Sequence, residues 1–193
     1  MFGALMASSV KYLSSDLNPI IICFYRCLMG LILILPFIIK NNFHALKSKN
    51  IKLQFSRAMI NIFSMIFWFS AIGMMQFEKA AALGFTTPLF TTILAIIILK
   101  EKIRFHRTAA LLIGFLGIIV IVRPGYVPLE LGAILILASA LSFSFVLIII
   151  KKLSAIDSSQ TIIIYHLLFG TPFFFVLSLF YWETVSLNQL IIF

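Results

Sequence analysis

The chain has few charged residues and almost no cysteine. Only 11% of its 193 residues are charged and 62% are hydrophobic, whereas an ordinary soluble domain is about a quarter charged. This balance excludes a soluble globular protein. Cys23 and Cys27 lie four positions apart within an apolar run, with no other cysteine in the chain. We interpret them as packing residues rather than as a redox pair or a metal site.

Acidic residues are scarce and do not cluster in the sequence. The chain has six Asp and Glu residues, and all six fall near the ends of apolar stretches. The three histidines, His44, His106 and His166, lack metal-binding spacing such as HExxH. We therefore expect no catalytic residues, no metal and no cofactor, so the chain is not predicted to be an enzyme. The sequence also contains no filter motif of the kind that a channel needs.

Long apolar runs make up most of the chain. Crossing the hydrocarbon core of a bilayer takes about 20 helical residues, and the runs here lack the alternating polarity of a transmembrane barrel. We predict an all-α, polytopic transmembrane helix bundle of about seven spans. The expected spans are residues 1–13, 19–39, 58–76, 80–99, 108–122, 130–150 and 161–182, with residues 77–79 as a tight link between the third and the fourth.

The net charge of +9 would suggest a nucleic-acid partner in a soluble chain. An up-and-down path instead separates the basic residues by side of the membrane. One side collects Lys40, Lys47, Lys49, Lys52, Arg57, Lys100, Lys102, Arg104, Arg107, Lys151 and Lys152, and the other only Lys11, Lys79 and Arg123. The positive-inside bias makes the rich side cytoplasmic. We expect a protein of the cytoplasmic (inner) membrane with the N-terminus inside and the C-terminus outside, whose partner is the lipid bilayer and not nucleic acid.

The sequence matches itself at an offset of 140 residues. The identical pairs are Lys11/Lys151, Leu13/Leu153, Ser14/Ser154, Ile22/Ile162, Tyr25/Tyr165, Leu28/Leu168 and Gly30/Gly170. Five predicted spans separate the two copies, and an odd number turns the second copy upside down. Inverted repeats are a recurrent architecture of secondary transporters, with the substrate site near the midplane. In so biased a composition, chance identity is the alternative explanation.

The same offset predicts that the chain is a shortened repeat protein. We expect a first repeat over residues 1–126, whose first helix is shortened, and a truncated, inverted second repeat over residues 129–193 that lacks three spans. A split or decayed gene, or misassigned ends, would explain both. A homodimer or a complementing chain is an alternative source of the missing spans.

Several short motifs occur in a recognisable order. They are Phe24-Tyr25-Arg26, Ala80 to Gly84 followed by Pro88-Leu89-Phe90, Leu99-Lys100-Glu101-Lys102, and Gly114 to Gly117. In this order and spacing the chain resembles the EamA-type members of the drug/metabolite transporter superfamily. The resemblance implies a ten-span protein of two inverted repeats that carries a small metabolite by alternating access. Substrates in this family include amino acids, nucleoside-type metabolites such as S-adenosylmethionine, vitamins and drugs. The alternative is a nonfunctional or structural remnant of a split transporter gene.

Two ionisable residues lie inside predicted spans, at equivalent positions of the two repeats. Arg26 is about 10 Å from the end of its span at 1.5 Å per residue. It is a candidate clamp for a substrate anion, since guanidinium binds carboxylate or phosphate through two parallel bonds; the alternative is that it snorkels to the outer interface or pairs with helix carbonyls. Its repeat mate His166 is a candidate substrate and proton-coupling residue, or else a hydrogen-bond partner between helices.

Further candidates lie beside this pair. Tyr25 and Tyr165 could stack on a substrate, with packing as the alternative. Pro88 breaks the hydrogen bonding of the fourth predicted span, so Thr87, Pro88 and Thr91 could line a polar cavity, unless threonine hydroxyls satisfy the kink locally. Glu78 is a second coupling candidate and is otherwise simply solvated. Asn61, Ser64 and Gln76 could face the same cavity or anchor their helix at the interface.

Overall fold

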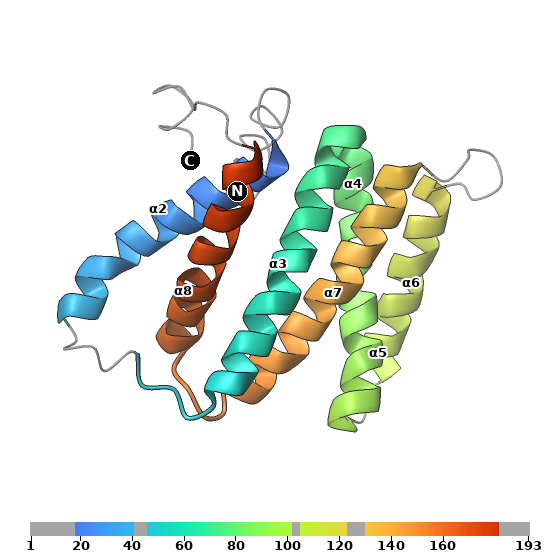
Figure 1. Ribbon diagram of the computed structural model, residues 1–193. Helices are drawn as coiled ribbons and strands as arrows, with labels where there is room; N and C mark the ends of the chain where they lie inside the picture. Colours follow the sequence, from blue (N-terminus) through green and yellow to red (C-terminus); the bar gives the residue numbers. More distant parts are fainter. Residues whose placement is uncertain (1–17, 41–45, 102–104, 123–129, 182–193) are drawn as a thin grey trace.

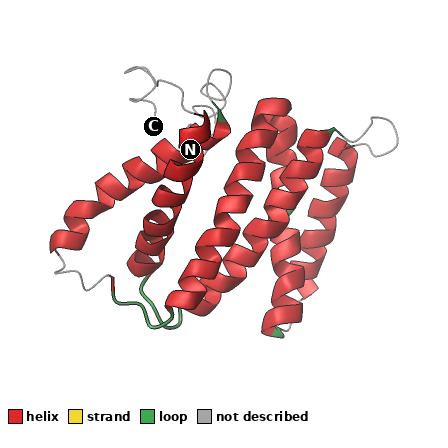
Figure 2. Cartoon of the chain, viewed as in Figure 1, coloured by secondary structure: helices red, strands yellow, loops and turns green. Residues whose placement is uncertain are grey.

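The computed structural model describes residues 18–40, 46–101, 105–122 and 130–181, and within them the only regular structure is helical (Figures 1 and 2). The helices are α2 (Pro19–Lys40), α3 (Ile51–Met74), α4 (Phe77–Gly84), α5 (Thr87–Leu99), α6 (Phe105–Val122), α7 (Leu131–Leu153) and α8 (Ser159–Ser178), followed by the 3-10 turn η2 (Leu179–Tyr181). The predicted all-α class is confirmed.

Within the described residues, five helical stretches are long and apolar enough to cross a membrane. They are Pro19–Lys40, Ile51–Met74, Phe77–Leu99, Leu131–Leu153 and Ser159–Tyr181. These correspond to the predicted second, third, fourth, sixth and seventh spans. The predicted fifth span forms α6, an 18-residue helix that is not among the five, and the predicted first span lies outside the described residues. The seven-span architecture therefore stays a prediction.

The helix of the third predicted span begins earlier than expected. It starts at Ile51 rather than at residue 58, because Asn50 caps it: the Asn50 side-chain oxygen accepts a hydrogen bond from the Leu53 backbone N–H at 3.1 Å. Polarity alone suggested a loop up to residue 57, but the cap adds nearly two helical turns. These turns carry Gln54 and Arg57 into the helix, where both are buried.

The link between the third and fourth predicted spans also differs. Phe77, Glu78 and Lys79, which we expected as the link, form the first turn of α4, and only Met75 and Gln76 connect the two helices. An acid is favourable in the first turn of a helix because it faces the positive end of the helix dipole, and Glu78 occupies that place.

The fourth predicted span is broken near Pro88, as the sequence indicates. Helix α4 ends at Gly84 and α5 begins at Thr87, with Pro88 in its first turn, where a missing N–H costs no helical hydrogen bond. At the break, the Thr86 hydroxyl donates to the Leu83 carbonyl at 2.7 Å.

The helices pack in two groups that meet along α3. Helix α3 packs most extensively against α7, α2 pairs with α8, and α3 also contacts α8 (Figure 1). One apolar cluster joins α2, α3 and α8; its buried residues are Ile22, Cys23, Phe24, Cys27, Ile62, Phe69 and Phe174. A second cluster joins α3, α4 and α7. The two cysteines are unbridged and buried in the first cluster, which confirms the packing interpretation.

Large apolar side chains also cover the outside of the described helices. Leu33 is 79% exposed, Ile113 71% and Phe180 78%. Such surface would be unfavourable in water but is suited to contact with lipid.

Candidate functional site

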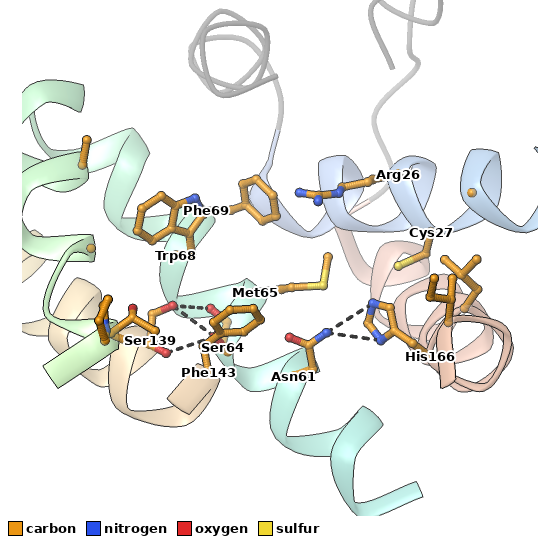
Figure 3. Close-up of a pocket in the computed structure, with 18 of the residues that line it drawn as sticks. Arg26, Cys27, Asn61, Ser64, Met65, Trp68, Phe69, Ser139, Phe143 and His166 are labelled. Carbon is orange, nitrogen blue, oxygen red and sulfur yellow. Dashed lines mark hydrogen bonds between the residues drawn. The ribbon is translucent and has the colours of Figure 1, made fainter. Parts of the chain in front are cut away.

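A cavity of about 1060 Å³ lies among α2, α3, α4, α7, α8 and the first turn of α5 (Figure 3). Its volume is in the range of sites that bind small molecules. Four of the predicted site residues line it: Arg26, His166, Thr87 and Pro88. The sequence therefore located residues from three separate helices that the fold brings to one cavity.

Arg26 lies on α2 and presents its guanidinium to the cavity. The central guanidinium carbon is 5.7 Å from the centroid of the Phe69 ring, within the range of a cation–π contact. The ion pairs among the described residues are Lys79–Glu130 and Lys151–Glu101, so no described carboxylate neutralises Arg26. A cation held against an aromatic face without an acidic partner is available to an anionic ligand.

His166 enters the cavity from α8 and contacts α3. The Asn61 side-chain nitrogen lies 3.3 Å from both Nδ1 and Nε2 of the His166 ring (Figure 3). The ring nitrogen that accepts the amide hydrogen must be unprotonated. His166 is thus a hydrogen-bond partner between helices, as one alternative held, and it also lines the cavity; its role in substrate binding and proton coupling stays a prediction.

The other four predicted site residues do not line the cavity. Tyr25 packs edge-on against Phe24, with ring centroids 5.4 Å apart. Tyr165 is buried, and its hydroxyl donates to the Leu46 carbonyl at 2.8 Å. Thr91 turns back on its own helix, and Glu78 is exposed at the start of α4.

Hydroxyl groups bond to the carbonyls of the first turn of α5, directly after the break. The Thr87 carbonyl accepts from Thr91 Oγ1 at 2.8 Å and from Ser144 Oγ at 3.0 Å. The Pro88 carbonyl accepts from Thr92 Oγ1 at 2.8 Å. The threonine hydroxyls near the break bond within their own segment, which favours the local interpretation, while Thr87 and Pro88 also form part of the cavity wall.

Comparison of the sequence with known protein families identifies the family of this chain. The sequence profile of the EamA-like transporter family matches residues 1–123, which is more than half of the chain. The chain belongs to the EamA-like transporter family. Membership, together with the apolar helices, identifies it as an integral membrane protein.

Curated relatives of this EamA-family chain are transporters. It is 28% identical over 180 residues to the S-adenosylmethionine uptake transporter of Rickettsia prowazekii, which covers 93% of this chain and 61% of the relative. It is 36% identical over 105 residues to the riboflavin transporter of Vibrio cholerae, covering 54% and 35%. Mouse solute carrier family 35 member G1 is 31% identical over 105 residues, covering 53% and 28%. The chain spans about three fifths of the length of the Rickettsia relatives. No solved structure matches it significantly.

Aromatic residues form much of the wall of this EamA-family cavity, and the sequence did not single them out. Trp68, Phe69 and Phe143 all line it. In a chain with 21 Phe residues, aromatic side chains that face a cavity have the same sequence pattern as those that face lipid. In the structure Gly84 lies close to this wall, because a Cβ added there would lie 3.1 Å from the Trp68 ring.

Polar residues of α3 were only partly anticipated. Asn61 and Ser64 line the cavity, as one of the two interpretations proposed, whereas Gln76 is exposed between α3 and α4. Ser64 and Ser139 are both buried and exchange hydrogen bonds across the α3–α7 contact. Ser64 Oγ donates to the Ser139 carbonyl at 3.0 Å, and Ser139 Oγ donates to the Ser64 carbonyl at 2.8 Å. This exchange fixes two walls of the cavity relative to each other.

A buried carboxylate closes the end of α3 that begins at Ile51. Asp157, in the turn between α7 and α8, accepts hydrogen bonds from Ser48 Oγ, from the Lys49 backbone N–H at 2.9 Å and from Gln54 Nε2 at 2.9 Å. Burial by itself would raise the pKa of Asp157, but these three bonds and the Lys49 charge outweigh it and lower that pKa below its ordinary value. The sequence suggested only a polar turn here.

Proposed function

We propose that this chain carries a small organic metabolite across the cytoplasmic membrane by alternating access, with the cavity around Arg26 as the substrate site. The observation that carries the proposal is the cavity itself, which combines aromatic walls with the Arg26 guanidinium, for which the described residues provide no carboxylate partner. Such a site fits a flat molecule that bears an anionic group, because rings stack on Trp68 and Phe69 while Arg26 binds a carboxylate or phosphate.

The names of the relatives narrow the substrate class. S-adenosylmethionine joins an adenine ring to an α-amino carboxylate, and riboflavin carries a flat ring system; both would use the aromatic wall, and only the first offers a carboxylate to Arg26. The long alignment to S-adenosylmethionine uptake transporters and the position of Arg26 support a nucleoside-type or amino-acid-like substrate.

His166 is the proposed coupling residue. Its ring faces the cavity and has an unprotonated nitrogen toward Asn61, so it can take up a proton as the contact with α3 changes. Glu78, the other candidate, is exposed in the first turn of α4 and does not line the cavity. Its position therefore does not support a coupling role.

The proposed architecture comprises two inverted repeats, over residues 1–126 and 129–193, within about seven spans. The lysine-rich ends of the helices face the cytoplasm, with the N-terminus inside and the C-terminus outside. A second copy or a complementing chain would supply further spans. The alternative of a nonfunctional remnant is not favoured, because the relatives are transporters.

Uptake by the full chain tests the proposal. Cells that produce the chain are given labelled S-adenosylmethionine or labelled riboflavin, and a fused reporter confirms insertion. We expect uptake of at least one, a loss of about tenfold or more for Arg26→Ala because a charge-assisted bond is removed, and partial retention for Arg26→Lys. Lys52→Gln is the matched control, since Lys52 is exposed on α3. Full uptake by a correctly inserted Arg26→Ala variant would refute the role of Arg26.

A further inference from the structure

A column of buried polar side chains runs along one face of α3. Gln54, Arg57, Asn61 and Ser64 are spaced three or four residues apart, which places them on one side of the helix. Gln54 is fully buried, Arg57 is 4% exposed and Asn61 is 9% exposed. Asn61 and Ser64 line the cavity. Arg57 and Gln54 lie nearer the start of the helix, and Gln54 bonds to the carboxylate of Asp157.

Arg57 is the unexplained member of this column. Its Nη2 donates to the Ile162 carbonyl of α8 at 2.6 Å, while its Nε has no hydrogen-bond partner. Both ion pairs found among the described residues involve other side chains. A buried cation that serves only to hold a structure normally has an anionic partner, because desolvating an isolated charge is costly. Among the described residues, the Arg57 guanidinium instead donates to one carbonyl, and its Nε–H has no acceptor.

Arg57 and Arg26 lie on either side of the contact between Asn61 and His166. Arg26 faces the cavity from α2, and Figure 3 shows Asn61 and His166 below it. Arg57 lies one helical turn beyond Asn61 on α3, and it contacts α8 one turn before His166. Ionisable residues at such depth in a membrane protein commonly mark a substrate path. The polar column of α3 therefore resembles a substrate path that is closed between the cavity and Asp157.

We propose that Arg57 is a second anion-binding position of the transport path, which receives the carboxylate or phosphate of the substrate from Arg26 when α3 and α8 separate. The inference rests on the proposed transport function. In the described conformation Asp157 keeps this lower position closed, because it ties Ser48, Lys49 and Gln54 of the α3 end to the α7–α8 turn. Separation of α3 from α8 frees the Arg57 donors for an anion.

Thiol labelling tests whether position 57 lies on a path, without knowledge of the substrate. The full chain carries Cys23→Ser and Cys27→Ser, with Arg57→Cys as the single thiol, and membrane vesicles are treated with an impermeant sulfonate-bearing thiol reagent. We expect little labelling while Asp157 is present and severalfold more when Asp157→Ala is added. Ala71→Cys is the matched control, since Ala71 is fully buried on the same helix in the α3–α4–α7 cluster, and it should stay unlabelled in both backgrounds. No increase at position 57, or an equal increase at position 71, would overturn the proposal.

Charge substitution separates an anion site from a structural tie to α8. Arg57→Gln keeps a donor for the Ile162 carbonyl but removes the charge, whereas Arg57→Lys keeps the charge. With labelled S-adenosylmethionine as the probe in proteoliposomes, we expect Arg57→Gln to lower the maximal rate about tenfold or more with little change in KM. Arg57→Lys should retain most of the rate. Equal rates for the two variants would overturn the proposal. If the wild-type chain carries no probe, the proposed function fails for that substrate, and the labelling experiment still decides the role of Arg57.

Discussion

Removal of the Asp157 carboxylate should destabilise the protein through Gln54. Asp157 accepts three hydrogen bonds, and their donors differ in burial. Ser48 and Lys49 are partly or fully exposed and can bond to water instead. The Gln54 side chain is fully buried, and its Oε1 already lacks a partner, so Asp157→Ala leaves the whole amide unsatisfied. An orphaned buried polar group costs about 1–3 kcal/mol, and the weaker bonds add about 1 kcal/mol.

A double-mutant cycle isolates this contribution. Gln54→Leu removes the buried amide together with its unsatisfied oxygen, so that Asp157→Ala in the Gln54→Leu background should cost about 1 kcal/mol instead of about 2–4 kcal/mol. The assay is reversible unfolding of the purified full chain in mixed micelles, followed by tryptophan fluorescence. Strict additivity of the two substitutions, or an Asp157→Ala protein as stable as wild type, would refute the reasoning.

The same carboxylate predicts a pH dependence of stability. Because its pKa is lower in the folded protein than in the unfolded chain, its contribution is fully present above the unfolded pKa and is lost as the pH falls through the folded value. Unfolding measured from pH 7 down to about pH 3 should therefore show an acid-side loss in the wild type that is smaller in Asp157→Ala. Parallel curves for the two proteins would contradict the assignment.

Two further substitutions have distinct expected effects. Gly84→Ala places a Cβ 3.1 Å from the Trp68 ring in the cavity, so substrate binding should weaken. Gly132→Ala places a Cβ 3.2 Å from the Met75 sulfur, and neither residue lines the cavity, so this variant should bind substrate as the wild type does. Ligand titration monitored by tryptophan fluorescence compares the two variants. Lys151→Gln removes the surface pair with Glu101 and should change stability by less than about 1 kcal/mol, which thermal unfolding checks at low and high salt.

Hydropathy was sufficient to locate most of the helices but not their ends. Apolar runs predicted the five candidate spans, because a membrane requires each crossing segment to satisfy its own backbone hydrogen bonds. The start of α3 was wrong by seven residues, since the Asn50 cap outweighs the polarity of the turns that follow it. A window that averages hydropathy cannot detect a cap, and so it placed Gln54 and Arg57 in a loop.

Depth within a span identified the two ionisable side chains Arg26 and His166 of the cavity, but the repeat symmetry did not predict the positions of their neighbours. Arg26 and His166 both line the cavity, whereas Tyr25 and Tyr165, which also pair in the repeat, pack elsewhere. Consecutive residues on a helix point about 100° apart, so a neighbour in sequence need not share the face of a site residue. The aromatic wall depends on how α3 and α4 meet, and that contact is not encoded in either helix alone.

The contacts of α3 differ on its two sides, and under the proposed function they predict which helices move together. Toward α7, α3 makes its most extensive contact, and Ser64 and Ser139 exchange two buried hydrogen bonds that would both be lost on separation. Toward α8, Arg57 donates to a single carbonyl and Asn61 bonds to either His166 nitrogen. A ligand anion, a proton or water can replace these few α8 contacts, whereas separation of α3 from α7 would break both serine hydrogen bonds and the most extensive helix contact together. Under the proposed transport function, we therefore expect α3 and α7 to move as one body and α2 and α8 to move against them.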